Sequence, residues 1–311
     1  MTPSQQTNLY SYKDQFNFLI NLYKKKKLPN KILFSGKKGI GKSTFALHLI
    51  NFIFSENEQH AYSLNENKIN DNNRSYKLIN SNSHPNFFLI NEKENKKDID
   101  VTQIRKMIDY ANKSSFNYME RFVIIDNVEN LNNHAANSLL KILEEPTTNL
   151  NFILILDSQK KILKTISSRC VKFDFSLNIK ERVKLISSIT EDNFYEKLSN
   201  DFKNTYLSPK FYFDLHNFFI QNNLDKYNLD IEDFLFLVFE NKLFKKNSFI
   251  LDHINHFVEL YFYKMIIKKI DIEKNFNSFN NLLIDLNNTV KYNLDFEPFF
   301  LKFMKIISDE R

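Results

Sequence analysis

The sequence predicts an α/β domain built on a parallel sheet, followed by a wholly helical C-terminal part. In the first half of the chain, short apolar runs alternate with helical patterns, which is typical of a parallel sheet with helices on both faces. After residue 175, Phe and Leu recur at spacings of three and four residues, as they do along helices. The expected strands are Ile32–Phe34, Phe87–Ile90, Phe122–Ile125, Phe152–Leu156 and Val171–Phe175.

These patterns divide the chain into three expected parts. Residues 1–175 form the α/β domain, residues 176–213 a small helical segment, and residues 214–311 a helical domain. Residues 55–83 interrupt the alternation, because they are polar, rich in Asn and poor in periodicity. We therefore expect an exposed insertion or a long loop there.

The composition excludes several classes of protein. A single cysteine, Cys170, leaves no internal disulfide framework and no cysteine-based zinc site. The chain does not open with a basic-then-apolar signal, and no apolar stretch reaches the roughly 18 residues of a membrane span. We therefore expect a cytoplasmic protein that does not associate with a membrane. The net charge of +6 permits contact with nucleic acid, although a lysine-rich surface explains it more simply.

The strongest motif is a phosphate-binding loop, which runs from Gly36 to Ser43 and holds all 3 glycines of the chain. It fits G-x-x-x-x-G-K-[ST], with an expected strand before it and an amphipathic helix after it. Glycines let successive backbone N–H groups turn toward phosphate oxygens, and the helix aims its positive N-terminal end at the same anion. The residues expected to bind nucleotide are Gly36, Gly39, Ile40, Gly41, Lys42, Ser43 and Thr44.

This loop predicts that the chain binds ATP or ADP with Mg²⁺. Lys42 would reach the β- and γ-phosphates, and Ser43 would hold the ion. A second Mg²⁺ ligand is expected on a neighbouring strand. Asp126 suits this role, because it ends the buried strand that begins at Phe122.

The residue after Asp126 argues against efficient hydrolysis. A hydrolysing ATPase with this layout usually has glutamate there, whereas this chain has Asn127. An amide cannot accept a proton, so Asn127 cannot serve as general base. Glu129 lies two residues further on and is the alternative base, although its direction would differ. We expect a chain that binds nucleotide but hydrolyses it poorly or not at all.

Two further motifs give the sequence a family resemblance. Residues 133–146 read NHAANSLLKILEEP, and the spacing predicts one helix with an apolar face, ended by Pro146. Residues 165–170 read TISSRC. Together with His84-Pro85 and with Val101 to Arg105, these segments resemble the clamp-loader subfamily of AAA+ proteins over residues 8–175. The resemblance implies an AAA+ domain followed by a helical lid at 176–213 and a helical collar at 214–311.

The resemblance also implies partners. Clamp loaders are rings of five subunits that load the sliding clamp onto primer–template DNA. The chain would share a hetero-pentameric ring with gamma/tau and delta subunits. Arg169 of the Ser-Arg-Cys motif would reach into the neighbouring subunit's ATP site as an arginine finger in trans. The plainer alternative for Arg169 is a surface ion pair. Cys170 is more simply a small buried residue than a reactive thiol.

Among clamp-loader subunits, the sequence resembles the delta-prime class. It keeps Ser-Arg-Cys, lacks the glutamate after Asp126 and ends at residue 311 without a long tail. Family members often carry a four-cysteine zinc site in the part corresponding to 55–83, and this chain has no cysteine there, so we expect no zinc. The usual second-sensor arginine has no clean counterpart, although Lys210 lies near its position.

Three functions therefore follow from the sequence. The leading one is a stator-like subunit that binds nucleotide passively and lends Arg169 to an adjacent motor subunit. The second is an active gamma-like motor in which Glu129, or a rearranged site, replaces the missing glutamate. The third is an accessory P-loop ATPase with the same core.

Overall fold

The computed structural model describes residues 3–92, 98–113, 120–145, 149–191, 193–203, 205–224, 227–269 and 271–309. Pro146, which we expected to end a helix, lies outside these ranges. The chain forms two compact units, Met1–Leu185 and Ile186–Arg311. Across the described ranges, no helix is both long enough and apolar enough to cross a bilayer.

The first unit contains a five-stranded parallel sheet. Its strands are β1 (Lys31–Gly36), β2 (Phe87–Ile90), β3 (Arg121–Ile125), β4 (Leu150–Asp157) and β5 (Val171–Asp174), in the order β2-β3-β4-β1-β5. Every pairing is parallel. All five predicted strands are thus confirmed, and so is the predicted sheet. β1 is flanked by β4 and β5, so the loop that follows β1 begins in the interior of the sheet.

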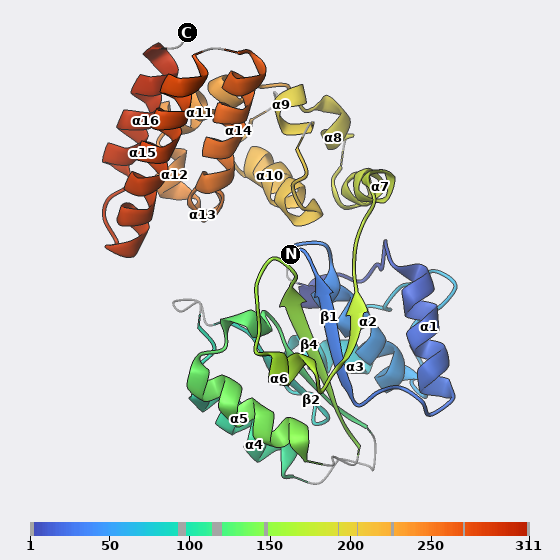
Figure 1. Ribbon diagram of the computed structural model, residues 1–311. Helices are drawn as coiled ribbons and strands as arrows, with labels where there is room; N and C mark the ends of the chain where they lie inside the picture. Colours follow the sequence, from blue (N-terminus) through green and yellow to red (C-terminus); the bar gives the residue numbers. More distant parts are fainter. Residues whose placement is uncertain are drawn as a thin grey trace. The chain divides into compact units, whose positions relative to one another are not determined.

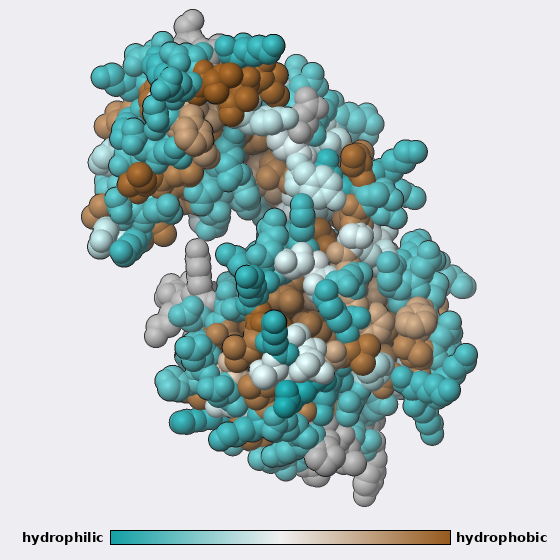
Figure 2. Space-filling model, viewed as in Figure 1, coloured by the Kyte–Doolittle hydropathy of each residue, from teal (hydrophilic) through white to brown (hydrophobic). Residues whose placement is uncertain are grey.

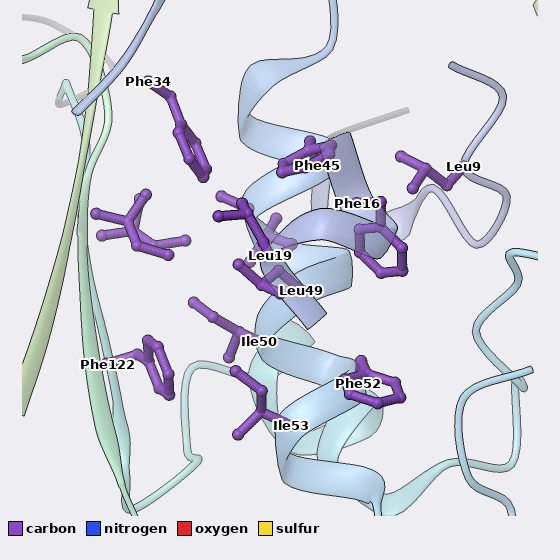
Figure 3. Packing of buried hydrophobic residues seen from close by; sticks show 14 of the residues in the cluster. Leu9, Phe16, Leu19, Phe34, Phe45, Leu49, Ile50, Phe52, Ile53 and Phe122 are labelled. Atoms are coloured by element: carbon purple, nitrogen blue, oxygen red, sulfur yellow. The ribbon is translucent and has the colours of Figure 1, made fainter. Parts of the chain in front are cut away.

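Helices cover both faces of this sheet, as the buried strands require. α1 (Lys13–Lys24) and α2 (Lys42–Ser55) lie on one face, and α4 (Val101–Ala111) and α5 (Asn133–Glu144) lie on the other (Figure 1). Each face has its own apolar core. Figure 3 shows the first core, in which Phe45 of α2 and Phe34 of β1 point toward each other. Their rings meet edge to face at 5.4 Å.

Helix α2 is buried more completely than its predicted amphipathic pattern requires. Phe45, Leu49 and Phe52 do share the core, but every residue from Phe45 to Ser55 is buried. The reason is that α2 is covered on its outer side as well. α1 and parts of the segment 55–83 pack there, so a helix that would otherwise need a polar face carries an apolar surface all round.

The expectation of an exposed loop at 55–83 is wrong in part. The segment contains α3 (Arg74–Asn80), and Tyr62, Ile69 and Ile79 are buried in the core. Side chains rather than an apolar pattern hold it in place. The Glu58 carboxylate accepts hydrogen bonds from the backbone at the start of α3 and from the Ser75 hydroxyl at 2.6 Å.

Polar contacts also anchor this segment to α2. Asn73 caps α3 by accepting from the backbone N–H of Tyr76 at 2.7 Å, and it also accepts from the buried Asn51 amide at 3.0 Å. The fully buried His48 ring contacts the Tyr62 hydroxyl at 3.0 Å. Polar side chains are tolerated in a core where hydrogen bonds of this kind satisfy them.

Over the residues that the structure describes, the second unit is helical, as predicted. Its helices are α8 (Phe194–Lys197), α9 (Asn200–Lys203), α10 (Pro209–Gln221), α11 (Ile231–Glu240), α12 (Leu243–Lys246), α13 (Ser248–Asp252), α14 (Ile254–Ile267), α15 (Ile272–Lys291) and α16 (Glu297–Asp309), while α7 (Ile179–Ile189) spans the boundary between the units. The core is aromatic. Phe211, Phe218, Phe234 and Phe257 are almost completely buried.

A charged cluster ties separate helices of this unit together. The Lys264 ammonium of α14 lies 3.1 Å from the Asp201 carboxylate of α9 and 2.8 Å from Asp230, which caps α11. It also lies 3.2 Å from Glu232. Burial alone would lower the pKa of Lys264, but the three carboxylates raise it above its ordinary value. The cluster joins a part that we assigned to the lid to a part that we assigned to the collar.

The predicted division at residues 213 and 214 falls within α10. The separation of lid and collar therefore stays a prediction, while the helical character of both parts is confirmed. Several large apolar side chains of this unit are exposed, and Figure 2 shows apolar patches among hydrophilic side chains on the face in view. These side chains include Tyr263, Ile266, Phe276 and Ile284.

Candidate nucleotide site and the position of Arg169

The phosphate loop lies between β1, which ends at Gly36, and α2, which begins at Lys42. Gly39 and Gly41 have φ angles of 79° and 98°, a region that residues with a side chain rarely adopt. Gly36 is required for a different reason. A Cβ atom there would lie 2.5 Å from the Phe175 carbonyl oxygen and 2.8 Å from Ile40 Cδ1. Each glycine that we predicted to bind phosphate thus has a backbone or packing reason to be glycine.

The Lys42 side chain lies folded over this loop. Its ammonium donates to the carbonyl oxygens of Gly36 at 2.6 Å and Lys37 at 2.7 Å. Lys42 is buried, and burial lowers its pKa, although the nearby carboxylates of Asp157 and Asp126 act in the opposite direction. The buried Lys42 ammonium and the N-terminal end of α2 both carry positive charge, so together they favour binding of an anion in the loop.

The two predicted magnesium ligands lie side by side. The Ser43 hydroxyl, in the first turn of α2, donates to Asp126 Oδ2 at 2.7 Å. Thr44 follows in the same turn and is half-buried. Hydroxyl and carboxylate oxygens are the ligands that Mg²⁺ prefers, and an ion bound with a nucleotide takes its remaining ligands from phosphates and water. The residues present therefore fit the ion that accompanies ATP or ADP.

The strand position of Asp126 differs from our expectation. We placed it on a strand next to β1, but it follows β3, and β4 lies between these two strands. The contact with Ser43 still forms, because all three strands end at the same edge of the sheet. Burial raises the pKa of the Asp126 carboxyl, while hydrogen bonds from Ser43 and from the backbone N–H of Asn127 lower it.

The acidic residue nearest to Asp126 in sequence is Glu129, whereas a hydrolysing ATPase usually has glutamate directly after the aspartate. Asn127 adopts a left-handed conformation with φ of 55°, and Glu129 follows in the short 3-10 helix Val128–Asn130. Glu129 Oε2 accepts from the backbone N–H of Asp157 at 3.2 Å. The Glu129 carboxylate is therefore near the loop, but a backbone group at the end of β4 fixes one of its oxygens.

Asp157 was missed in the sequence. It is the last residue of β4 and pairs with Gly36 in the parallel register, and it is 8% exposed. Its carboxylate has the largest charge effect on Lys42. The signal was present, because Asp157 follows an apolar strand directly, as Asp126 does. The sequence pattern does not indicate that β4 lies beside β1, which is what brings Asp157 close to the loop.

Arg169 lies in a turn between α6 (Lys164–Ser167) and β5. Its guanidinium donates to the Thr165 carbonyl oxygen at 2.7 Å and to the Glu144 carboxylate at 2.6 Å. The arginine side chain is 33% exposed and its glutamate partner 56%. The surface ion pair that we considered as the plainer alternative is present, and such exposed pairs are weak. Burial raises the pKa of the neighbouring Cys170 thiol to about 11, which suits a packing residue.

The phosphate loop and Arg169 lie at opposite ends of the strands. The loop lies where the parallel strands end, which we call the carboxyl edge of the sheet. Arg169 lies where they begin, which we call the amino edge. Val171, at the start of β5, pairs with Ile32, near the start of β1, and Gly36 is the last residue of β1. At the usual rise of a strand, this places Arg169 at least about 13 Å from the start of the loop. The residues that we predict to bind phosphate lie together in the fold, and Arg169 is separate from them.

Comparison with known proteins places this chain in a family. A family model described as "DNA polymerase III, delta subunit" matches residues 12–178, which is more than half of the 311 residues. The chain belongs to this family. The matched region contains the whole sheet, the phosphate loop and Arg169.

Subunits named delta′ of DNA polymerase III are among the relatives of this family member. That of Pseudomonas aeruginosa is 31% identical over 140 residues, which cover 45% of this chain and 41% of the relative. That of Bacillus subtilis is 31% identical over 159 residues, covering 50% and 45%. The gamma/tau subunit of Mycoplasma genitalium is 29% identical over 182 residues, covering 58% and 27%. The chain spans less than half the length of each of these relatives.

One solved structure supports the fold of the family member over nearly its full length. A DNA polymerase III gamma subunit-related protein of Thermotoga maritima matches 94% of this chain and 99% of its own, with a TM-score of 0.51 and 14% sequence identity. The likeness shows the fold, which is the predicted parallel sheet with a helical C-terminal region.

Proposed function

We propose that this chain is a delta-prime-like subunit of a bacterial clamp loader, which binds ATP or ADP with Mg²⁺ and lends Arg169 to a neighbouring subunit. Membership of the DNA polymerase III delta subunit family and similarity to the delta′ subunits support the clamp-loader role. The partners would be gamma/tau and delta subunits in a hetero-pentameric ring, and through that ring the sliding clamp and primer–template DNA.

One observation carries the proposal: Arg169 lies at the edge of the sheet away from its own phosphate loop. An arginine finger must contact the γ-phosphate that it stabilises. Arg169 cannot do so for a nucleotide bound at Gly36 to Ser43 without unfolding β5. It is partly exposed, and its only side-chain ion pair among the described residues is with the exposed Glu144. It can therefore serve a site on another chain.

The acidic groups near the loop support passive binding. The amide of Asn127 cannot take a proton, and Glu129 is turned toward the backbone N–H of Asp157. Lys42, Ser43 and Asp126 remain able to hold phosphates and magnesium. We expect the purified chain to bind MgADP and MgATP in equimolar amount and to show no steady-state ATP hydrolysis above background.

A second function rests on Glu129. Its carboxylate lies close enough to Lys42 to affect the pKa of that ammonium, and the chain is also similar to a gamma/tau subunit. If Glu129 acts as general base, the chain is a gamma-like motor. The expected result is then ATP hydrolysis by the purified chain that Glu129→Gln abolishes without loss of ATP binding.

Copurification tests the clamp-loader role itself. The tagged chain is mixed with gamma/tau and delta subunits, and the complex is measured by size-exclusion chromatography with light scattering. A single species that contains all three kinds of subunit supports the proposal. Failure to form any complex contradicts it and favours the remaining alternative, an accessory P-loop ATPase.

A further inference from the structure

The phosphate loop has a buried contact outside the motif. Tyr12 lies directly before α1 and is 8% exposed. Its hydroxyl donates to the carbonyl oxygen of Ile40, in the loop, at 3.2 Å. The two residues are separated by 28 positions. Tyr12 lies outside the motif G-x-x-x-x-G-K-[ST], so the contact is visible only in the fold.

Packing holds Tyr12 in a strained backbone conformation. Its backbone is left-handed, with φ of 66° and ψ of 31°, which costs a residue with a side chain about 1 to 2 kcal/mol. Its ring packs edge to face against Phe175, with 4.9 Å between ring centroids, and against Phe45 at 6.3 Å. A strained backbone that is retained in a packed site indicates that the surroundings determine where the side chain lies.

The carbonyl that Tyr12 contacts belongs to the peptide between Ile40 and Gly41. This peptide is trans, so its C=O and N–H point in opposite directions. A donor that holds the Ile40 carbonyl therefore fixes the direction of the Gly41 N–H. Because Gly41 has φ of 98° and no side chain, its backbone can otherwise rotate at little cost. Were this peptide to flip, a carbonyl oxygen would face the phosphates in place of a donor.

We propose that Tyr12 is a positioning residue of the phosphate loop, whose hydroxyl holds the Ile40 carbonyl so that the Gly41 N–H faces the phosphates of the bound nucleotide. The inference rests on the proposed nucleotide binding. The ligand class is the diphosphate group that ADP and ATP share, because the contact acts on the backbone cradle and not on a base or ribose pocket. Phe175, which packs on the Tyr12 ring, also approaches Gly36, so the same aromatic pair supports both ends of the loop.

The test compares Tyr12→Phe with Tyr10→Phe. The first substitution keeps the ring between Phe45 and Phe175 and removes only the hydroxyl. The second removes a hydroxyl two residues away, which accepts an exposed hydrogen bond from the Asn8 side chain. Loss of one hydrogen bond to a neutral group predicts MgADP binding that is weaker by about threefold to tenfold in Tyr12→Phe. Binding of magnesium pyrophosphate weakens by the same factor, and Tyr10→Phe binds both ligands as the unchanged chain does.

A signal from the ligand-free chain makes the test independent of binding. Ile40-Gly41 is the only Ile-Gly pair in the sequence. A sample labelled with ¹³C-carbonyl isoleucine and ¹⁵N-glycine therefore gives one carbonyl–amide correlation, which reports this peptide alone. Tyr12→Phe is expected to shift or broaden that correlation, and Tyr10→Phe to leave it unchanged.

The possible outcomes separate the two claims. An unchanged correlation together with unchanged affinities for MgADP and pyrophosphate in Tyr12→Phe overturns the role of Tyr12. Absence of MgADP binding by the unaltered chain contradicts the proposed function instead, and the role of Tyr12 in phosphate binding falls with it. The ligand-free correlation still decides in that case whether the hydroxyl orients the Ile40-Gly41 peptide.

Discussion

The two edges of the parallel sheet differ in how firmly they hold their charged side chains. At the carboxyl edge, Lys42 is buried and donates to two loop carbonyls, and Ser43 is bonded to Asp126. At the amino edge, Arg169 is one-third exposed and pairs with the more exposed Glu144. A group that is enclosed by its own fold acts only on a ligand that enters the loop. A group on an exposed edge can be turned toward a neighbouring chain, because exposed ion pairs are weak and exchange readily.

The largest expected effect is at Gly36, where the carboxyl edge is most tightly packed. Gly36→Ala places a Cβ atom 2.5 Å from the Phe175 carbonyl oxygen, and β1 and the chain after β5 must move apart. We expect the free energy of unfolding in urea to fall by about 3 kcal/mol.

Gly41→Ala is the matched control for Gly36→Ala. No atom lies within 4 Å of a Cβ built at Gly41, so only its positive φ opposes the change, at about 1 to 2 kcal/mol. Equal losses of stability in the two variants would contradict the close approach of β1 to Phe175.

The second effect is a loss of stability in acid that originates in α2, the helix of the phosphate loop. His48 is fully buried, and its Nε2 donates to the Gln6 carbonyl oxygen at 3.0 Å, so Nδ1 accepts from the Tyr62 hydroxyl. Burial lowers the pKa of His48 to about 4 from its ordinary value of 6.5. The unfolded chain therefore binds a proton at a higher pH than the folded chain does.

The sign of the effect follows from proton linkage. The contribution of neutral His48 is complete above pH 6.5 and is lost as the pH falls toward 4, by up to about 3 kcal/mol. The measurement is the free energy of unfolding from pH 7.5 to pH 4 for the chain and for His48→Gln, which cannot titrate there. The slope below pH 6.5 should be smaller in the variant, and identical slopes would show that His48 accepts its proton freely in the fold.

The third prediction concerns Asp126, whose charge should lower the stability of the fold while it supports binding of magnesium. Burial raises the pKa of Asp126, so its carboxylate destabilises the fold above its ordinary pKa, and this cost disappears as the pH falls. Asp126→Asn removes the charge. We expect a higher melting temperature of the ligand-free chain at pH 7.

The same substitution should remove the magnesium dependence of nucleotide binding. We expect the unaltered chain to bind ADP at least about tenfold more tightly with Mg²⁺ than without it, a difference of about 1.4 kcal/mol, and Asp126→Asn to bind equally in both conditions. Titration calorimetry with and without EDTA gives both values. A variant that keeps the full magnesium effect would place the ion elsewhere.

The smallest expected effect is at the amino edge. Because the Arg169–Glu144 pair is exposed, Arg169→Ala and Glu144→Ala should each change the free energy of unfolding by less than about 1 kcal/mol. Urea unfolding of both variants at low and high salt measures this. A loss of several kcal/mol in Arg169→Ala would mean that the arginine holds its own fold together, and the comparison between the two edges would no longer stand.

Sequence patterns predict the carboxyl edge well because its main residues are contiguous. Gly36 to Ser43 form one motif, and the strand before Asp126 is an unbroken apolar run. The contacts that complete the site join distant positions. Tyr12 and Ile40 are 28 residues apart, and Ser43 and Asp126 are 83 apart. Periodicity carries no information on which strands are neighbours, so the place of β4 between β1 and β3 could not be predicted.

The segment 55–83 shows a second limit. It lacks an apolar period, and it is instead held by polar pairs such as Asn73 with Asn51 and Glu58 with Ser75. Burial of paired polar groups leaves no trace in a hydropathy pattern, because the same residues form exposed loops elsewhere. In the helical unit, the aromatic periodicity predicted the class of structure, but the Lys264 cluster that joins α9, α11 and α14 could not be predicted from it.

We propose that this chain acts through Arg169, near the amino ends of the strands, and only holds nucleotide at the phosphate loop. This proposal is tested most directly by single-turnover ATP hydrolysis in the reconstituted complex with clamp and primed DNA, using Arg169→Ala and Lys42→Ala separately. The account predicts that Arg169→Ala slows hydrolysis at the neighbouring site by about 10³-fold, while Lys42→Ala leaves every turnover rate nearly unchanged. A severe loss of hydrolysis in Lys42→Ala, with normal rates in Arg169→Ala, would contradict it.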